Sequence, residues 1–260
     1  MCDNGLIGEG KPTVSSLFSV AGKKVLITGG SRGIGAMLAH GFVSHGARVY
    51  VAARNEAACE ATAAQLRHDG FAVALSADLS TPEGVRALAT QYAEHEDTLD
   101  VLVNNAGTTW GEPFDTYPAD GFMKVLNVNV TAPFLLTQAL APALRRAATK
   151  ADPARVIMIG SIDGIRLPDF DSFAYSASKA ALHQLTRHVA KTLAPDHVTV
   201  NALAPGYFPS QMTAFMFNDQ AALAARIPLK RTGEADDLAG GCNPACFTGR
   251  QLHHRGCDSG

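Results

Sequence analysis

The sequence predicts a doubly wound α/β fold with one parallel sheet in a single domain. Three observations predict it: short continuous apolar runs, helical segments between them, and a glycine-rich turn after the first run. Continuous apolar runs suit strands that are buried on both faces, because helices cover both sides of a parallel sheet. At 260 residues and without a break in composition, the chain has an ordinary length for one such domain.

The expected strands and helices alternate along the chain. The first apolar run, 25–28, precedes a helix at 34–43 whose apolar residues recur every three and four positions. The second run, 49–53, precedes an alanine-rich helix at 55–68. Further strands are expected at 72–75, 99–103, 156–159 and 198–201, with helical segments between them.

Bulk properties exclude several classes of protein. A formal charge of -2 gives no reason to expect nucleic acid or an anionic membrane as a partner. No apolar run approaches the roughly 18 residues of a membrane span, and residues 1–20 lack the basic end and apolar core of a signal peptide. Five cysteines do not make a disulfide framework in a chain of this length. We therefore expect a cytoplasmic protein with a flexible lead-in at 1–19.

Glycines at the end of the first strand predict a dinucleotide site. Gly29, Gly33 and Gly35 lie where a strand turns into a helix, so the backbone can approach a pyrophosphate and the helix offers unpaired N–H groups. A plain glycine turn is the alternative for such a pattern alone. Cofactor-binding residues are expected in this turn and after the later strands: Gly29, Ser31, Arg32, Gly33, Ile34, Gly35, Arg54, Asp78, Leu79, Asn105, Ala106, Gly107, Tyr175, Lys179, Pro205 and Gly206.

The end of the second strand indicates which nicotinamide cofactor is preferred. An acidic residue there holds both adenosine ribose hydroxyls of NAD, but this strand ends with Ala53 and Arg54. Arg32 lies inside the glycine turn. Because two guanidinium groups form bidentate contacts with a 2′-phosphate, NADP(H) is preferred and NAD(H) stays open. Arg54 as a solvated helix-start residue is the alternative.

Four polar residues predict the reduction of a carbonyl. Tyr175 and Lys179 lie four apart, so on a helix they share one face. Hydride delivery leaves negative charge on the carbonyl oxygen, and Tyr175 can supply the proton. We expect the Lys179 charge to lower the pKa of that phenol. Ser161 can donate a hydrogen bond to the substrate oxygen, and Asn129 is expected to bond a water that leads to Lys179.

From about residue 20 to 240 the chain resembles the short-chain dehydrogenase/reductase family, with its Rossmann-type fold. The resemblance rests on the glycine turn, on Asn104 to Gly107, and on the set Asn129, Ser161, Tyr175 and Lys179. Within the family the chain looks most similar to β-ketoacyl reductases of rhamnolipid and fatty-acid synthesis, in segments 105–111, 178–185 and 204–210. The resemblance implies a homotetramer or dimer and NADPH-dependent reduction of a 3-oxoacyl thioester.

Loops after the strands are expected to choose the substrate. They are 108–114, 163–173 and the stretch after Pro209. Their aromatic residues suit an acyl chain or a bulky ketone better than a sugar, although such side chains often serve only in packing. The aromatic residues are Trp110, Phe114, Phe170, Phe173, Phe208, Phe215 and Phe217.

After Ala239 the sequence departs from that family's pattern, because the expected apolar helix and last strand are replaced by a polar tail. The tail offers zinc ligands, but their spacing matches no familiar site, so no metal is expected. If the reading frame of the coding DNA is shifted by one nucleotide at Cys242, the genetic code permits a peptide that resembles the missing C-terminus of the family. We therefore predict that residues 242–260 result from a frameshift, which is either real or a sequencing error. The domain before it is expected at 20–241, with its last edge strand missing or altered. The zinc-type residues are Cys242, Cys246, His253, His254 and Cys257.

Three functions remain open at this point. The first is NADPH-dependent reduction of a 3-oxoacyl thioester, a small-molecule substrate. The second is a dehydrogenase of another secondary alcohol, a steroid or a small ketone. The third is an inactive cofactor-binding remnant, which the altered tail would favour and the intact set of Asn129, Ser161, Tyr175 and Lys179 opposes.

Overall fold

The structure, a computed structural model, describes residues 19–168, 170–214, 220–225 and 227–238. Six parallel strands form one sheet in the order β3-β2-β1-β4-β5-β6. The expected strands are confirmed at or near the predicted positions. Their bounds are β1 (Lys24–Thr28), β2 (Arg48–Ala53), β3 (Phe71–Ser76), β4 (Val101–Asn104), β5 (Ala154–Ile159) and β6 (Val198–Leu203).

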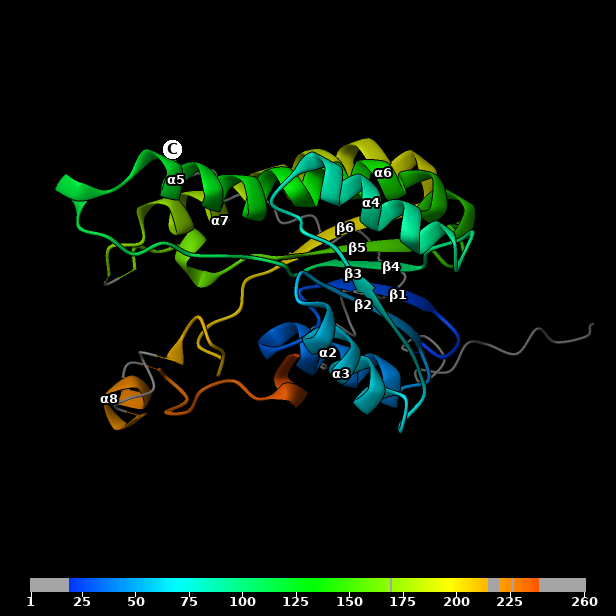
Figure 1. The fold of residues 1–260 in the computed structure, drawn as a ribbon, viewed down its shortest axis with the longest axis horizontal. Coiled ribbons are helices and arrows are strands. Elements are labelled where there is room, and N and C mark those ends of the chain that lie inside the picture. Colours follow the sequence, from blue (N-terminus) through cyan, green and yellow to red (C-terminus); the bar gives the residue numbers. More distant parts are fainter. Residues whose placement is uncertain (1–18, 169, 215–219, 226, 239–260) are drawn as a thin grey trace, which may run out of the picture.

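Helices cover both faces of the sheet, which confirms the doubly wound arrangement (Figure 1). On one face lie α2 (Gly33–Ser44) and α3 (Glu56–Leu66). The other face carries α4 (Pro82–Ala93), α5 (Ala119–Leu126), α6 (Ala132–Ala147) and α7 (Phe173–Leu193). The short helix α8 (Gln220–Ala225) follows β6. Among the described residues, no helix has the length and apolarity needed to cross a bilayer.

Alternating side chains of the strands build a core on each face. Val25 and Ile27 of β1 belong to the core beneath α2 and α3, whereas Leu26 belongs to the core beneath α4, α6 and α7. All three side chains are fully buried. Because successive side chains of a strand point to opposite faces, a strand covered on both sides needs an uninterrupted apolar run. This requirement explains the pattern from which the strands were predicted.

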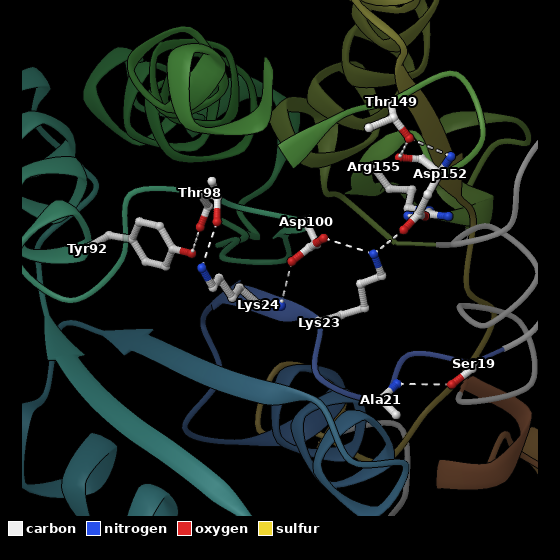
Figure 2. Close-up of polar contacts among 10 residues, drawn as sticks. All are labelled: Ser19, Ala21, Lys23, Lys24, Tyr92, Thr98, Asp100, Thr149, Asp152 and Arg155. Carbon is white, nitrogen blue, oxygen red and sulfur yellow. Dashed lines mark hydrogen bonds and ion pairs between the residues drawn. The ribbon is translucent and has the colours of Figure 1, made fainter. Parts of the chain in front are cut away.

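Charged side chains close the sheet at the amino ends of its central strands (Figure 2). Lys23 Nζ bonds Asp100 Oδ1 at 3.0 Å and also pairs with Asp152. The Lys24 amide donates to Asp100 Oδ2 at 2.9 Å, so the same carboxylate joins the starts of β1 and β4. Arg155 of β5 pairs with Asp152 at 2.8 Å. This edge is therefore occupied by structural ion pairs, and the opposite edge is left for a site.

The carboxyl ends of the strands carry the predicted functional segments. Between β1 and β4 the strand order reverses, and ligands of doubly wound sheets bind outside such a switch point. In the part of the chain that the structure describes, β6 ends the sheet. The predicted altered tail at 242–260 lies outside the described residues, and so do residues 1–18 of the predicted lead-in.

Candidate active site

The glycine turn after β1 is packed against the loop after β4. A Cβ on Gly29 would lie 2.9 Å from Asn105 Nδ2, and Gly29 has a φ of 65°, where glycine is favoured. A Cβ on Gly35 would lie 2.2 Å from the Gly29 carbonyl oxygen. Asn105 Nδ2 donates to the Thr28 carbonyl at 2.9 Å, which fixes the two loops together. The turn therefore requires glycine at positions 29 and 35.

The turn leads into a helix whose N-terminus has no side-chain cap. Helix α2 follows Arg32, whose side chain caps none of the backbone N–H groups, and its first turn contains no acidic residue. These N–H groups can therefore bind a phosphate. The Arg32 guanidinium donates to Gln211 Oε1, and both Arg32 and Arg54, which follows β2, are exposed. The donors present thus fit a dinucleotide, and both guanidinium groups are accessible to a 2′-phosphate.

The other predicted cofactor residues lie at the same edge. Asp78 follows β3, and its Oδ1 accepts from the Ser80 amide at 3.0 Å. Hydrogen bonds from Ser80 lower the pKa of Asp78, and the Arg54 charge acts in the same direction. Arg54 and Asp78 are thus neighbours at the ends of β2 and β3. Each remaining segment follows one strand: 29–35 follows β1, Leu79 follows β3, 105–107 follows β4, and Pro205 and Gly206 follow β6.

Helix α7 presents Tyr175 and Lys179 together. Lys179 is 4% exposed, and its Nζ lies 5.5 Å from the centroid of the Tyr175 ring. The same Nζ donates to the Ile159 carbonyl at 2.7 Å, at the end of β5. A Cβ on Gly107 would lie 3.7 Å from Lys179 Nζ, so the ammonium also faces the loop after β4. The predicted juxtaposition of phenol and cation is present.

Ser161 lies beside the phenol of Tyr175. It precedes a short 3-10 turn, Ile162–Gly164, and its Oγ accepts from the Asp163 amide at 3.1 Å. Its side chain is also hydrogen-bonded to Tyr175. Ser161 is buried, so this hydroxyl and the phenol are held against each other. Two hydroxyl groups that meet in this way can both donate to one carbonyl oxygen.

Asn129 acts on the site through protein groups. It lies in a π-helical turn, Asn127–Thr131, between α5 and α6. Its Oδ1 accepts from the Thr108 amide at 2.9 Å, and its Nδ2 donates to the Thr108 carbonyl at 3.0 Å. Nδ2 also donates to Ser178 Oγ at 2.9 Å, which in turn donates to the Tyr175 carbonyl at 2.7 Å. The amide thus has protein partners in Thr108 and Ser178, and the predicted water that leads to Lys179 stays a prediction.

Burial sets the pKa values of the two central groups. It raises the pKa of Tyr175, with the Asp163 charge acting in the same direction and the hydrogen bond with Ser161 in the opposite one. The expected lowering by Lys179 is therefore wrong for this chain. Burial lowers the pKa of Lys179 to about 8. Tyr175 thus stays protonated at neutral pH, as a proton donor must.

Sequence reasoning missed Thr108, Ser178 and His183. Ser178 precedes Lys179 and is fully buried, but its role depends on the π-helical turn, which the sequence pattern does not indicate. Thr108 contributes only backbone atoms to Asn129, so its side chain gives no signal. His183 lies four residues after Lys179, a spacing that places both on one face of α7.

The buried His183 is expected to make the stability of the protein depend on pH. Its Nε2 is buried without a hydrogen-bond partner among the described residues, and a Cβ on Gly160 would lie 2.0 Å from it. Burial lowers the pKa of His183 from 6.5, and the charges of Lys179 and Arg187 act in the same direction. As pH falls, His183 therefore takes up its proton at a higher pH in the unfolded chain than in the folded one. The free energy of unfolding consequently decreases as pH falls below about 6.5.

We expect His183→Gln to flatten the loss of stability between about pH 7.5 and pH 5.5, because glutamine takes up no proton. Urea unfolding at both pH values measures the effect. His188→Gln, an exposed position on the same helix, is the matched control and should keep the wild-type slope. An unchanged slope in His183→Gln would show that another group is responsible.

Aromatic residues of the predicted substrate loops have two different roles. Phe114, Tyr117 and Phe173 line a cavity of about 400 Å³, with the Phe114 and Phe173 rings 5.7 Å apart. Trp110 instead packs on Gly121, whose Cβ would lie 2.8 Å from the indole. Phe208 is buried against Gly233. For Trp110 packing explains the aromatic ring, and Phe215 and Phe217 lie outside the described residues.

The described residues contain no group of three or more His, Cys, Asp or Glu side chains that could hold a metal ion. Cys242, Cys246, His253, His254 and Cys257 lie outside the described part of the chain. The site at the carboxyl edge is therefore built from hydroxyl, amide and ammonium groups.

Known proteins resemble this chain over most of its length. A rhamnolipids biosynthesis 3-oxoacyl-[acyl-carrier-protein] reductase of Pseudomonas aeruginosa is 49% identical over 85% of this chain and 88% of its own. The 5-keto-D-gluconate 5-reductase of Escherichia coli K12 is 34% identical, over 87% and 89%. A solved active-site complex of Pseudomonas aeruginosa RhlG with NADP has a TM-score of 0.86 and 46% identity, covering 89% and 91%.

A family model described as short chain dehydrogenase matches residues 23–221. The matched segment contains the glycine turn, Asn129, Ser161, Tyr175 and Lys179. The fold, the order of the strands and this match agree. The chain is an oxidoreductase that belongs to the short-chain dehydrogenase family.

Proposed function

We propose that this protein reduces the ketone of a 3-oxoacyl thioester to a secondary alcohol with NADPH. The proposal rests on one observation: Tyr175 lies next to both Ser161 and Lys179. These three residues lie at the carboxyl ends of the strands, where the glycine turn also lies. The relative with 49% identity is named as a 3-oxoacyl-[acyl-carrier-protein] reductase, which supports the thioester. The NADP complex of RhlG and the exposed Arg54 support the cofactor.

The roles of the residues follow from their contacts. When bound, reduced nicotinamide supplies the hydride that reaches the carbonyl carbon. Tyr175 gives its phenolic proton to the carbonyl oxygen, and Ser161 donates a hydrogen bond to that oxygen while charge develops on it. Lys179 stabilises the phenolate that is left. Asn129 holds the backbone of α7 through Ser178, so it is a positioning residue.

The second candidate is reduction of a free ketone or dehydrogenation of another secondary alcohol. The observation in its favour is the 34% identity with a keto-gluconate reductase. The apolar lining of the cavity at Phe114 and Phe173 favours an acyl chain over a sugar. An inactive remnant is the third candidate, and the intact hydrogen bonding of Asn129, Ser161 and Tyr175 opposes it.

A panel of substrates and cofactors tests the proposal. We expect kcat/KM to be highest for a 3-oxoacyl thioester, and at least about tenfold higher with NADPH than with NADH, since Arg54 can form charge-assisted bonds to the 2′-phosphate. Arg54→Asp should reverse the cofactor preference. Activity confined to free ketones or sugars would refute the thioester, and activity with NADH alone would refute the cofactor.

We also propose that residues 20–241 form the catalytic domain and that 242–260 is an altered tail. All the proposed site residues precede the tail. A tail that lacks the family's last strand would impair the dimer or tetramer that the family suggests, because an exposed parallel edge remains. The coding DNA tests this: codons that do not permit the family peptide in another frame would refute a frameshift.

A further inference from the structure

A second cation, Arg166, lies on the loop that begins at Ser161. Arg166 follows the 3-10 turn that begins after Ser161, and it is exposed. Its Nη2 donates a hydrogen bond of 2.7 Å to Tyr207 Oη, and its Cζ lies 5.6 Å from the Tyr207 ring. The contact joins the loop after β5 to the loop after β6. It therefore holds the guanidinium at a defined place between the two loops.

Arg166 lines a cavity of about 430 Å³, and Ile162, the residue after Ser161, lines it too. The Ile162 amide donates to the Pro205 carbonyl at 3.2 Å, so the cavity adjoins the loops that carry the site. Ile165 and Leu167, on either side of Arg166, are 74% and 91% exposed. The wall itself is largely apolar, with Ile162, Phe208, Ile227, Pro228 and Leu229.

The cavity carries one uncompensated positive charge. Its other cation, Arg231, is neutralised by two bonds to Asp237, one of them 2.8 Å long. Arg166 makes no ion pair with any residue that the structure describes. Of the five N–H groups of a guanidinium, the hydrogen bond to Tyr207 uses one. An apolar cavity with one such donor fork fits a ligand whose chain carries apolar groups and ends in an anion.

We propose that Arg166 binds the phosphate of the phosphopantetheine arm of the substrate. The proposal rests on the proposed thioester function. When the ketone lies at Ser161 and Tyr175, the sulfur side of the substrate can extend past Ile162 into this cavity. The methylene and dimethyl groups of the arm then pack on the apolar wall, and the phosphate takes the free side of the guanidinium, to which it is geometrically matched. Arg166 would thus select carrier-bound or coenzyme-bound substrates.

Two substrates that differ only in the phosphate test the proposal. They are a 3-oxoacyl-4′-phosphopantetheine and the corresponding 3-oxoacyl-pantetheine, each assayed with NADPH. For the wild type we expect the phosphate to raise kcat/KM about tenfold, mainly through KM, as one charge-assisted pair does. In Arg166→Gln this ratio should fall to nearly one, and Arg166→Lys should keep part of it, because lysine retains the charge without the fork.

Arg187→Gln is the matched control, because it removes an exposed arginine on α7 whose side chain bonds only Gln184 among the described residues. The tenfold ratio should survive in this variant, which excludes a general effect of net charge. A ratio near one in the wild type, or a ratio that survives in Arg166→Gln, would overturn the role of Arg166 and leave the thioester function intact. Failure to reduce either thioester would overturn the proposed function and the role of Arg166 with it.

Discussion

Gly35→Ala is expected to weaken NADPH binding by about 100-fold, equivalent to about 2.7 kcal/mol. A methyl group at this position would lie 2.2 Å from the Gly29 carbonyl oxygen and 2.5 Å from Asn105 Nδ2. The first contact is with backbone, which no change of rotamer relieves. Helix α2 must therefore move away from the turn, and the N–H groups that face the pyrophosphate move with it. Overpacking adds a loss of stability of about 1–3 kcal/mol.

Fluorescence titration with NADPH and thermal unfolding measure these two effects separately. Gly111→Ala is the matched control, because its nearest neighbour, the Asp171 carbonyl oxygen, would lie 3.8 Å away at an ordinary contact distance. This variant should bind NADPH like the wild type. A folded Gly35→Ala protein with wild-type affinity would show that the glycine turn does not shape a dinucleotide site.

Local patterns were enough to predict the sheet and the residues at its carboxyl edge. The inner strands β2, β1, β4 and β5 are buried on both faces, so their apolar runs are continuous and visible in the sequence. The spacing of Tyr175 and Lys179 predicts their shared face because α7 is a regular helix. In the same way, the glycines after β1 indicate the turn before any neighbour is known.

Contacts between distant segments explain what the sequence did not predict. The raised pKa of Tyr175 results from burial in the assembled site, and the charge of Lys179 alone suggested the opposite direction. The link from Asn129 to Ser178 spans α7 and a π-helical turn that no sequence pattern indicates. The position of Trp110 in a predicted substrate loop suggested a substrate contact, whereas its ring packs on Gly121. Each of these depends on the packing of helices and loops that lie far apart in the sequence.

Tyr175→Phe is expected to lower the rate of reduction about 1000-fold, or about 4 kcal/mol, within the range of general acid catalysis. Phenylalanine keeps the ring and its packing and removes only the hydroxyl that bonds Ser161. Binding of NADPH should be little changed, because Lys179 retains its hydrogen bond to the Ile159 carbonyl. Tyr92→Phe is the matched control: it removes a hydroxyl that donates to the Thr98 carbonyl at 2.8 Å, at the opposite edge of the sheet.

The most direct measurement is a single turnover, in which enzyme loaded with NADPH is mixed with a 3-oxoacyl thioester and the loss of NADPH absorbance is followed. We predict a fast phase in the wild type and in Tyr92→Phe. In Tyr175→Phe we predict a phase about 1000-fold slower, although this variant should bind NADPH normally. An equally fast phase in Tyr175→Phe would contradict the assignment of Tyr175 as the proton donor, on which the proposed mechanism depends.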